Sequence, residues 1–148
     1  MSKADRRTWV FQANPSKYDI YASLAVEAEE WWNCNQHASV IGADDRVLVW
    51  ISGKEDGIYA VGTVLSNPVP ISDSPRGLTY WYDKRAGRMP KHRARVRYDE
   101  VLLDRPVLRS LLVCDPQLWD MRIISQPRGT NFAVTTDEWA ALEWWLSS

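Results

Sequence analysis

The sequence predicts a single α+β domain in which short strands form a strongly curved sheet or small barrel, with helices at its flanks. Three observations favour this class. The chain has 148 residues, and 45% of them are hydrophobic, which is enough for one compact core. Short segments rich in β-branched residues alternate with helical patterns, and helical patterns lie near both ends. No repeat, low-complexity tract or linker interrupts the sequence, so residues 1–148 are expected to form one domain.

The first third of the chain predicts a strand followed by a helix. Residues 9–13 are extended and apolar, and Asn14-Pro15 ends them because proline fixes φ and restricts the residue before it. Asp19 is a candidate N-cap, and apolar residues then recur at steps of three and four up to about Asn33. We therefore expect one helix over residues 19–33.

The middle of the chain predicts a hairpin, a loop and a basic strand. Residues 46–52 and 58–65 are rich in β-branched residues and flank the turn 53–57, which is typical of a β-hairpin. Residues 66–78 hold three prolines and many small polar residues, so they predict a loop. In residues 93–103 arginines alternate with apolar residues, which predicts a strand with one strongly basic face.

The last third predicts short helical turns and a final helix. Pro106 can open a helix over residues 107–112, and another helical turn is expected over residues 115–119. Residues 126–131 read as a loop and 132–134 as a short extended segment. A capping box then starts a helix whose one face carries the apolar residues. The capping pair is Thr135 and Glu138, and the apolar face comprises Trp139, Leu142, Trp145 and Leu146.

The sequence offers no metal site, and it has no membrane segment. Cys34 and Cys114 lie far apart and are expected to be buried free thiols, while His37 and His92 have no partner at a metal-like spacing. The longest apolar stretches, such as residues 47–51, are much shorter than the roughly 20 residues of a membrane helix. The N-terminal residues lack the apolar region and cleavage site of a signal peptide. A cytoplasmic protein without a cofactor is therefore expected.

Catalytic groups are likewise not recognisable. Asp44 and Asp45 form the most suggestive carboxylate pair, but adjacent strand residues point to opposite faces and do not make an acid/base dyad. A turn and capping role is expected for them. We therefore assign no catalytic residue, and detectable nuclease or deaminase turnover by the domain would be needed to revive an enzymatic interpretation.

The charge of the chain is unevenly distributed. The formal net charge is −1, yet residues 76–97 carry eight basic residues against one acidic residue, a local charge of +7 that leaves −8 elsewhere. Tyr80-Trp81-Tyr82 lies within this segment, so stacking groups accompany the positive charge. This composition is typical of a surface that contacts phosphates, although a salt-bridged strand and loop is the alternative. The candidate phosphate contacts are Lys84, Arg85, Arg88, Lys91, Arg93 and Arg95.

Nine tryptophans are an unusual number for this length, and most are expected to fill the core. Some of them belong to ordered motifs that identify a family. The motifs are Trp9-Val10-Phe11-Gln12-Ala13-Asn14-Pro15 with Tyr18-Asp19, Trp32-Asn33 with Asn35-Gln36-His37, Gly42 and Asp44 followed by residues 47–53 and 57–62, and Gln126-Pro127 with Gly129-Thr130-Asn131-Phe132. This set, spread over nearly the whole chain, resembles the EVE domain.

The resemblance implies a fold and a site. The fold is the PUA-like pseudo-barrel shared with YTH and ASCH domains, and relatives hold an extruded base between aromatic walls while backbone or amide groups read its polar edge. By this resemblance Trp32 is the first candidate wall, and Trp81 or Tyr82 is the second. Asn14, Asn33, Ser52 and Gly53 would lie at the rim, where a glycine lets a ligand approach the backbone closely.

The resemblance also implies a partner. The expected role is a non-catalytic reader of nucleic acid that holds a modified base, with 5-methylcytosine or a related modified cytosine in DNA favoured. EVE domains also occur as sensors fused to restriction nucleases or AAA+ ATPases, so such a partner is expected as well. Two alternatives stay open: an RNA-binding PUA-like module, and an interaction domain whose Trp-rich last helix contacts a partner. Exposure of Trp144 would favour the latter.

Overall fold

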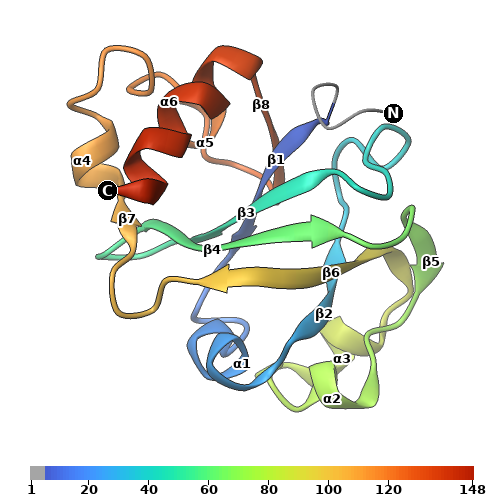
Figure 1. Ribbon diagram of the computed structural model, residues 1–148. Coiled ribbons are helices and arrows are strands. Elements are labelled where there is room, and N and C mark those ends of the chain that lie inside the picture. The colour runs from blue at the N-terminus through green and yellow to red at the C-terminus, as the bar shows by residue number, and fades with distance from the viewer. Residues whose placement is uncertain (1–5) are drawn as a thin grey trace.

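A computed structural model describes residues 6–148 of the chain. Residues 1–5 lie outside the described part. They belong to the N-terminal segment that was predicted to lack a signal peptide. Figure 1 shows one curled sheet with helices at its two ends. The strands are β1 (Thr8–Ala13), β2 (Glu29–Asn33), β3 (Arg46–Ile51), β4 (Gly57–Val64), β5 (Val69–Ile71), β6 (Lys91–Val101), β7 (Val107–Leu108) and β8 (Asn131–Val134). The helices are α1 (Ile20–Val26), α2 (Pro75–Leu78), α3 (Lys84–Arg88), α4 (Arg109–Leu112), α5 (Arg122–Ser125) and α6 (Thr136–Ser147).

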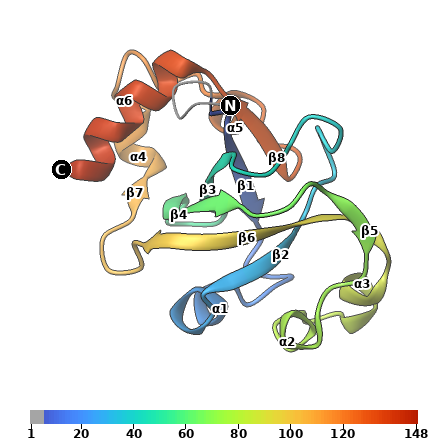
Figure 2. The same ribbon diagram turned by 45° about the vertical axis from the view of Figure 1, so that its right-hand side comes forward.

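The strands form a mixed sheet with the order β2-β6-β4-β3-β1-β8. Strand β1 runs parallel to β3, and the other pairs along this path are antiparallel. Strand β5 pairs with β6, and β7 pairs with β4. Register shifts in the β3–β4 and β4–β6 pairs add bends, as bulges generally do. The sheet curls into a partial barrel, which confirms the predicted fold class (Figure 2).

Two separate cores form on the two faces of this sheet because strand side chains alternate between faces. The inner core packs Phe11, Val49 and Ile51 against Leu24 of α1 and Trp32 of β2. We define the outer core by the residues that pack on the opposite face. They are Val10, Leu48, Trp50 and Ile58 from the strands, and Leu112, Leu118, Met121, Ile123 and Leu142 from the segments around α4, α5 and α6.

Several predicted elements are confirmed. Strand β1 ends at Ala13, the hairpin is β3–β4, and Asp19 accepts a hydrogen bond from the backbone N–H of Ala22 at the start of α1. The capping box of α6 is present, since the Thr135 side chain accepts from the Glu138 backbone and the Glu138 carboxylate accepts from the Thr135 backbone. Local hydrogen-bonding chemistry specifies these features, and it is readable in sequence.

The helix predicted over residues 19–33 is wrong in its second half. Helix α1 ends at Val26, and Glu29–Asn33 forms strand β2, paired with β6 so that Trp32 lies opposite Ala94. Spacing at three and four residues fits a helix, but the adjacent tryptophans also suit a strand whose side chains alternate between two environments. Pairing with the distant strand β6 determines that residues 29–33 form a strand and not the end of a helix. Trp32 therefore lies on a strand.

Smaller differences concern the short elements. The predicted loop 66–78 contains β5 and α2, the latter capped by Ser74 with Pro75 in its first turn. The helix predicted over residues 107–112 begins as β7 and becomes α4 only at Arg109. Cys34 is buried as expected, whereas Cys114 is exposed, which corrects the expectation for that thiol. Among the helices of residues 6–148, none combines the length and apolarity needed to span a membrane.

Candidate functional site

A cavity of about 500 Å³ opens at the end of the barrel where β1, β2 and β3 meet the segment of α2 and α3. Its wall is mixed, with aromatic rings, amides, carboxylates and lysines together. The lining residues are Gln12, Ala13, Asn14, Lys17, Tyr18, Glu30, Trp31, Trp32, Asn33, Asn35, Ser52, Asp73, Trp81, Ala86, Lys91, Gly129 and Thr130. A cavity that combines apolar faces with a few convergent polar groups is the usual form of a ligand site.

The cavity gathers five of the seven residues that the sequence proposed for the pocket. They are Asn14, Trp32, Asn33, Ser52 and Trp81. Gly53 and Tyr82 are not among the lining residues. Gly53 has φ +120°, so this turn requires glycine for its backbone conformation. Tyr82 is 64% exposed and lies outside the cavity, which leaves Trp81 as the aromatic residue of that pair in the wall.

Trp81 is held rigidly by its neighbours. Its indole Nε1 donates to Asp73 Oδ2 at 2.7 Å, and its ring packs edge-on against Tyr18 with 5.2 Å between ring centroids. A Cβ on Gly87 of α3 would come within 2.6 Å of the indole Cδ1, so this glycine makes room for the ring. The indole is therefore fixed in orientation before any ligand binds, which reduces the entropy lost on stacking.

Adjacent tryptophans on β2 also line the cavity. Trp32 is 7% exposed, its Nε1 donates to the Tyr98 hydroxyl at 2.9 Å, and it packs in the inner core. Trp31 is half-buried, and sequence reasoning missed it because residues 19–33 read as one helix. The double tryptophan was a usable signal, since aromatic residues are enriched in strands.

The rim is formed by a loop that two glutamines hold in place. The Gln12 side chain donates to the carbonyls of Pro127 and Gly129, and Gln36 Oε1 accepts from the backbone N–H groups of Thr130 and Asn131. Gly129 has φ +123°, a conformation that favours glycine. These contacts explain why the Gln-Pro-x-Gly-Thr-Asn segment belongs beside β1 and β2.

Two carboxyl groups line the cavity wall. Glu30 is 8% exposed, and its Oε2 accepts from the Tyr18 hydroxyl at 2.8 Å. Burial raises the pKa of Glu30 to about 7, although hydrogen bonds from neighbouring hydroxyls oppose the shift. Burial also raises the pKa of Asp73, against the lowering effect of the Trp81 indole N–H. Neither carboxyl was a candidate from the sequence, because only the packing of β2 and the segment of α2 brings both carboxyls to the same cavity.

The structure separates the basic residues of the 76–97 segment into distinct roles. Arg93 is fully buried, and its guanidinium donates to the backbone carbonyls of Ile71, Met89 and Ala86. It therefore leaves the set of candidate phosphate contacts and ties β6 to β5 and α3 instead. The strand face carrying Arg93, Arg95 and Arg97 is not uniformly exposed, because the β5–α3 segment covers its first residue.

Other members of the segment are engaged in the fold. Arg95 pairs with Glu29 at 2.5 Å, Arg97 pairs with Asp99 at 2.9 Å, and Lys84 Nζ donates to three carbonyls around the end of α2. Salt bridges therefore account for part of the +7 segment, as the alternative interpretation anticipated. Surface pairs of this kind contribute about 0–1 kcal/mol and are easily exchanged for another anion.

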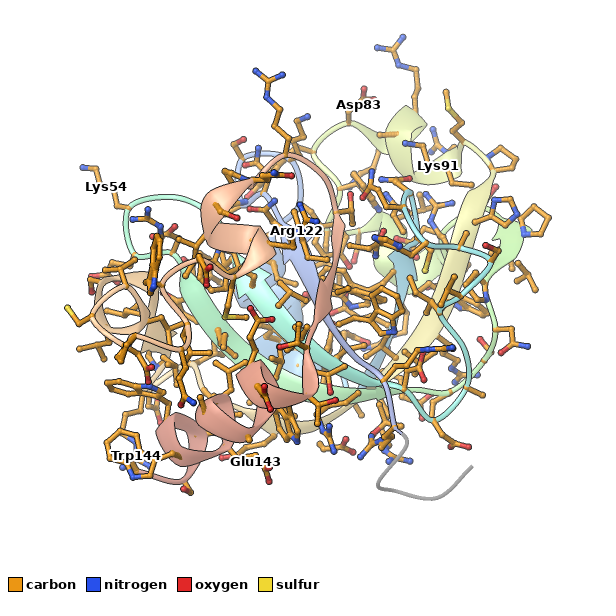
Figure 3. All side chains as sticks on the ribbon, turned by 90° about the horizontal axis from the view of Figure 1, so that it is seen from above. Lys54, Asp83, Lys91, Arg122, Glu143 and Trp144 are labelled. Atoms are coloured by element: carbon orange, nitrogen blue, oxygen red, sulfur yellow. The ribbon has the colours of Figure 1, made fainter. Side chains whose placement is uncertain are left out.

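Three basic residues of the segment are the least engaged. Within residues 6–148, Arg88 and Lys91 form no ion pair, and Arg85 has a single contact of 3.5 Å with Asp83. Lys91 lines the cavity, and Arg85 and Arg88 project from α3, whose Ala86 lines it. Figure 3 shows Lys91 and Asp83 on one side of the molecule and Trp144 on the opposite side. A positive rim thus flanks the aromatic cavity.

The carboxylate pair considered from the sequence has a structural role in the described part of the chain. Asp45 is buried and accepts from the Trp9 indole and the Gly42 backbone, while Asp44 sits in a turn at φ 74°. No cluster of three potential metal ligands occurs within residues 6–148. Trp144 is 63% exposed, as the interaction-domain alternative required, but it lies on α6 away from the cavity (Figure 3).

A curled mixed sheet with flanking helices has the architecture expected of a PUA-like fold. The sequence model of the EVE domain matches residues 7–144, and the chain belongs to this family. No curated protein sequence matches the chain.

Solved structures share the fold at low sequence identity. A hypothetical protein from Leishmania major has a TM-score of 0.72 with 18% identity, covering 99% of this chain and 98% of that one. A Pseudomonas syringae protein has a TM-score of 0.68 with 16% identity, covering 93% and 98%. Human THYN1, solved in complex with DNA containing 5-methylcytosine, has a TM-score of 0.68 with 14% identity, covering 96% and 98%.

Proposed function

We propose that this domain is a non-catalytic reader of nucleic acid that holds one extruded, modified base in the cavity, with 5-methylcytosine in DNA as the favoured ligand. The observation that carries the proposal is the cavity itself, which places Trp81 and the β2 tryptophans beside unengaged cations. The EVE family match supports this role, as does the structural likeness to THYN1, whose structure contains 5-methylcytosine DNA.

The cavity suits a flipped base in size and in composition. Its volume of about 500 Å³ lies within the range of small-molecule sites, so a nucleobase with part of its sugar can enter. Stacking of a base on an aromatic ring contributes about 1–3 kcal/mol, which is comparable to the few kcal/mol needed to extrude it from a duplex. A methyl group adds about 0.8 kcal/mol on burial, so a modest preference for the methylated base is expected.

The cations supply the remaining part of the interface. Lys91 lies in the cavity wall and Arg88 projects from the neighbouring helix α3, so phosphates on either side of an extruded nucleotide would meet positive charge. Such contacts give affinity without reading sequence. Lys84, Arg85 and Arg95 remain candidates for the outer part of this surface, where a phosphate would compete with the contacts they now make.

The proposal is tested by fluorescence anisotropy with labelled oligonucleotides that differ at one base. Duplex DNA with a single 5-methylcytosine should bind about fourfold more tightly than its unmodified counterpart, as one buried methyl group predicts. Substitution W81A should weaken binding by tenfold or more, because a stacking partner is lost. Substitution W81F keeps an aromatic face without the N–H bonded to Asp73 and should retain most of the affinity.

A matched control is available on the same chain. Substitution W144A removes an exposed indole from α6, on the other side of the molecule, and should leave binding unchanged (Figure 3). Equal affinity for all DNAs, together with an unaffected W81A, would overturn the reader assignment. Tighter binding of a matched RNA series would move the assignment to an RNA-binding module.

We extend the proposal to a sensor role, in which an associated nuclease or AAA+ ATPase supplies the chemistry and this domain supplies recognition. Restriction of methylated but not unmethylated plasmid in cells that express the protein in its natural gene context would support it. Equal survival of both plasmids would contradict it.

A further inference from the structure

The cavity wall contains polar atoms that have no partner in the protein. Three buried side-chain oxygens in residues 6–148 lack a hydrogen bond, namely Glu29 Oε1, Glu30 Oε1 and Asn33 Oδ1. Glu29 Oε1 lies 2.5 Å from the Arg95 guanidinium, so an ion pair compensates it. Glu30 and Asn33 both line the cavity. Because unpaired buried polar atoms are rare in proteins, these two oxygens are the places where a ligand would complete the hydrogen bonding.

Neighbouring aromatic residues fix the orientation of the Glu30 carboxyl. Its Oε2 accepts from the Tyr18 hydroxyl at 2.8 Å, and Tyr18 is itself positioned by its edge-on contact with Trp81. Oε1 has no partner in hydrogen-bonding geometry, although the Ser23 and Tyr98 hydroxyls also face the carboxyl and only 8% of the residue is exposed. Through Tyr18 the carboxyl is therefore linked to Trp81 of the cavity wall.

We propose that Glu30 reads the hydrogen-bonding edge of the base, and that it binds an adjacent acceptor and donor, such as N3 and N4 of cytosine, through one shared proton. This inference rests on the proposed function and specifies how its site selects a ligand. With the proton on Oε1, the carboxyl donates to N3 while Oε2 accepts from the N4 amino group. With the proton on N3, the same two hydrogen bonds form between a cytosinium edge and a carboxylate.

The proton count fixes the sign of the pH dependence. When Glu30 is ionised in the free protein, one proton must come from solvent as the base binds. No other covalent bond is made or broken. Because burial raises the pKa of Glu30 to about 7, the free protein loses the needed proton as the pH rises above neutrality. A guanine edge presents two donors, N1–H and the N2 amino group, and would favour the ionised carboxylate with the opposite pH dependence.

Several other polar and titratable groups face Glu30, and their effect on the pH dependence of binding must be separated from that of Glu30. Tyr18 and Ser23 approach it from the segment of α1, Tyr98 from β6 and Asp73 from the loop before α2. The pKa values of Tyr18 and Tyr98 are raised by burial and by the Glu30 charge, so both stay protonated below pH 10. Asp73 also has a raised pKa, and Lys17 and Lys91 lie in the cavity wall, so Glu30 must be isolated by substitution.

Substitution E30Q provides that isolation, because an amide is the uncharged equivalent of the protonated carboxyl. Its N–H₂ group donates where the acid O–H would, and its carbonyl accepts in the other position. Binding of DNA with one 5-methylcytosine is measured at pH 6.5 and 8.5 for wild type, E30Q and E30A. Wild-type affinity should fall about tenfold or more between these pH values, since the competent fraction sets the apparent affinity. E30Q should match wild type at pH 6.5 and change little at pH 8.5, and E30A should bind weakly at both.

Calorimetry of the wild-type protein gives a second measurement that needs no variant. Titration at pH 8 in two buffers of different ionisation enthalpy should show uptake of about one proton per 5-methylcytosine bound. Zero uptake, or an E30Q variant with the wild-type pH dependence, would overturn the role of Glu30 while the preference for modified DNA still stands. Loss of any preference for modified DNA in the wild type would instead overturn the proposed function, and this inference with it.

Discussion

The two faces of the curled sheet are built on different principles. On the outer face, α6 packs an apolar surface around Leu142, and the Trp145 indole N–H is paired with Asp115 at 2.9 Å. On the cavity side, Glu30 and Asn33 each keep a buried oxygen without a partner in residues 6–148. The outer core is complete without a ligand, whereas the cavity is not. The difference separates a part of the molecule that supplies stability from a part that, under the proposed function, gives up stability for binding.

The largest effect is expected from breaking the outer core. Substitution L142A removes a fully buried side chain from the contact between α6 and the sheet and should lower the free energy of unfolding by about 2–5 kcal/mol. Urea unfolding followed by circular dichroism measures it. Affinity of the folded fraction for 5-methylcytosine DNA should stay at the wild-type value. The near-isosteric L142M should cost less than about 1.5 kcal/mol, and an affinity loss in either variant would show that the two faces are coupled.

A smaller effect, with a characteristic pH dependence, is expected from the cavity. The pKa of Glu30 rises from 4.5 in its ordinary state to about 7 in the fold. A raised pKa means that the folded state holds the proton more tightly, so Glu30 contributes stability below pH 4.5 that is lost as the pH rises to 7. Relative to wild type, E30Q should therefore gain stability over this interval, by about 2–3 kcal/mol at its upper end. Urea midpoints at half-unit pH steps give the comparison.

A matched glutamate provides the control for that measurement. The Arg76 guanidinium and the Tyr80 hydroxyl hold the pKa of Glu27 at about 2, so its contribution has the opposite sign. Its stabilising effect is present above the ordinary glutamate pKa and is lost as the pH falls towards 2. Substitution E27Q should lower stability at neutral pH and leave the profile between pH 4.5 and 7 unchanged. An E30Q profile parallel to wild type would contradict the assignment of the neutral-range titration to Glu30.

The contrast between faces also explains what the sequence could predict. The capping box at Thr135 and the N-cap at Asp19 depend on residues three positions apart, and both were predictable. The amphipathic face of α6 follows from the same local information. The motifs at the ends of β1 and β3 predicted the approximate place of the site, because they are ordered along the chain and characteristic of the family.

The remaining features depend on contacts between distant segments. Residues 29–33 became a strand only through pairing with β6, and this pairing brought Trp31 into the cavity wall. Arg93 became buried because β5 and α3 cover the start of β6, which alternation along a single strand does not reveal. Glu30 is a surface-type residue in composition, and only the packing of Tyr18 and Asp73 around it distinguishes it. Sequence patterns therefore predicted which end of the barrel carries the cavity, but not that Trp31 and Glu30 lie in its wall.

The smallest expected effect concerns the cations at the cavity rim. Substitution R88Q removes a charge from α3 that has no ion-pair partner in residues 6–148, so stability should not change measurably. If Arg88 contacts a phosphate, the slope of log affinity against log salt should become less steep by about one, and modified and unmodified DNA should weaken alike. Anisotropy titrations between 50 and 300 mM salt measure both quantities.

The matched variant R105Q removes an arginine from the β6–β7 connection, at the opposite end of β6 from Lys91, and should leave the salt slope unchanged. If both substitutions reduce the slope equally, the positive charge acts as a diffuse field over the whole domain and not as a rim around one cavity. If only R88Q reduces it, the phosphates lie beside α3. In that case the bound strand runs along the side of the molecule where Trp81 and Glu30 line the cavity, and the two sheet faces divide binding from stability as proposed.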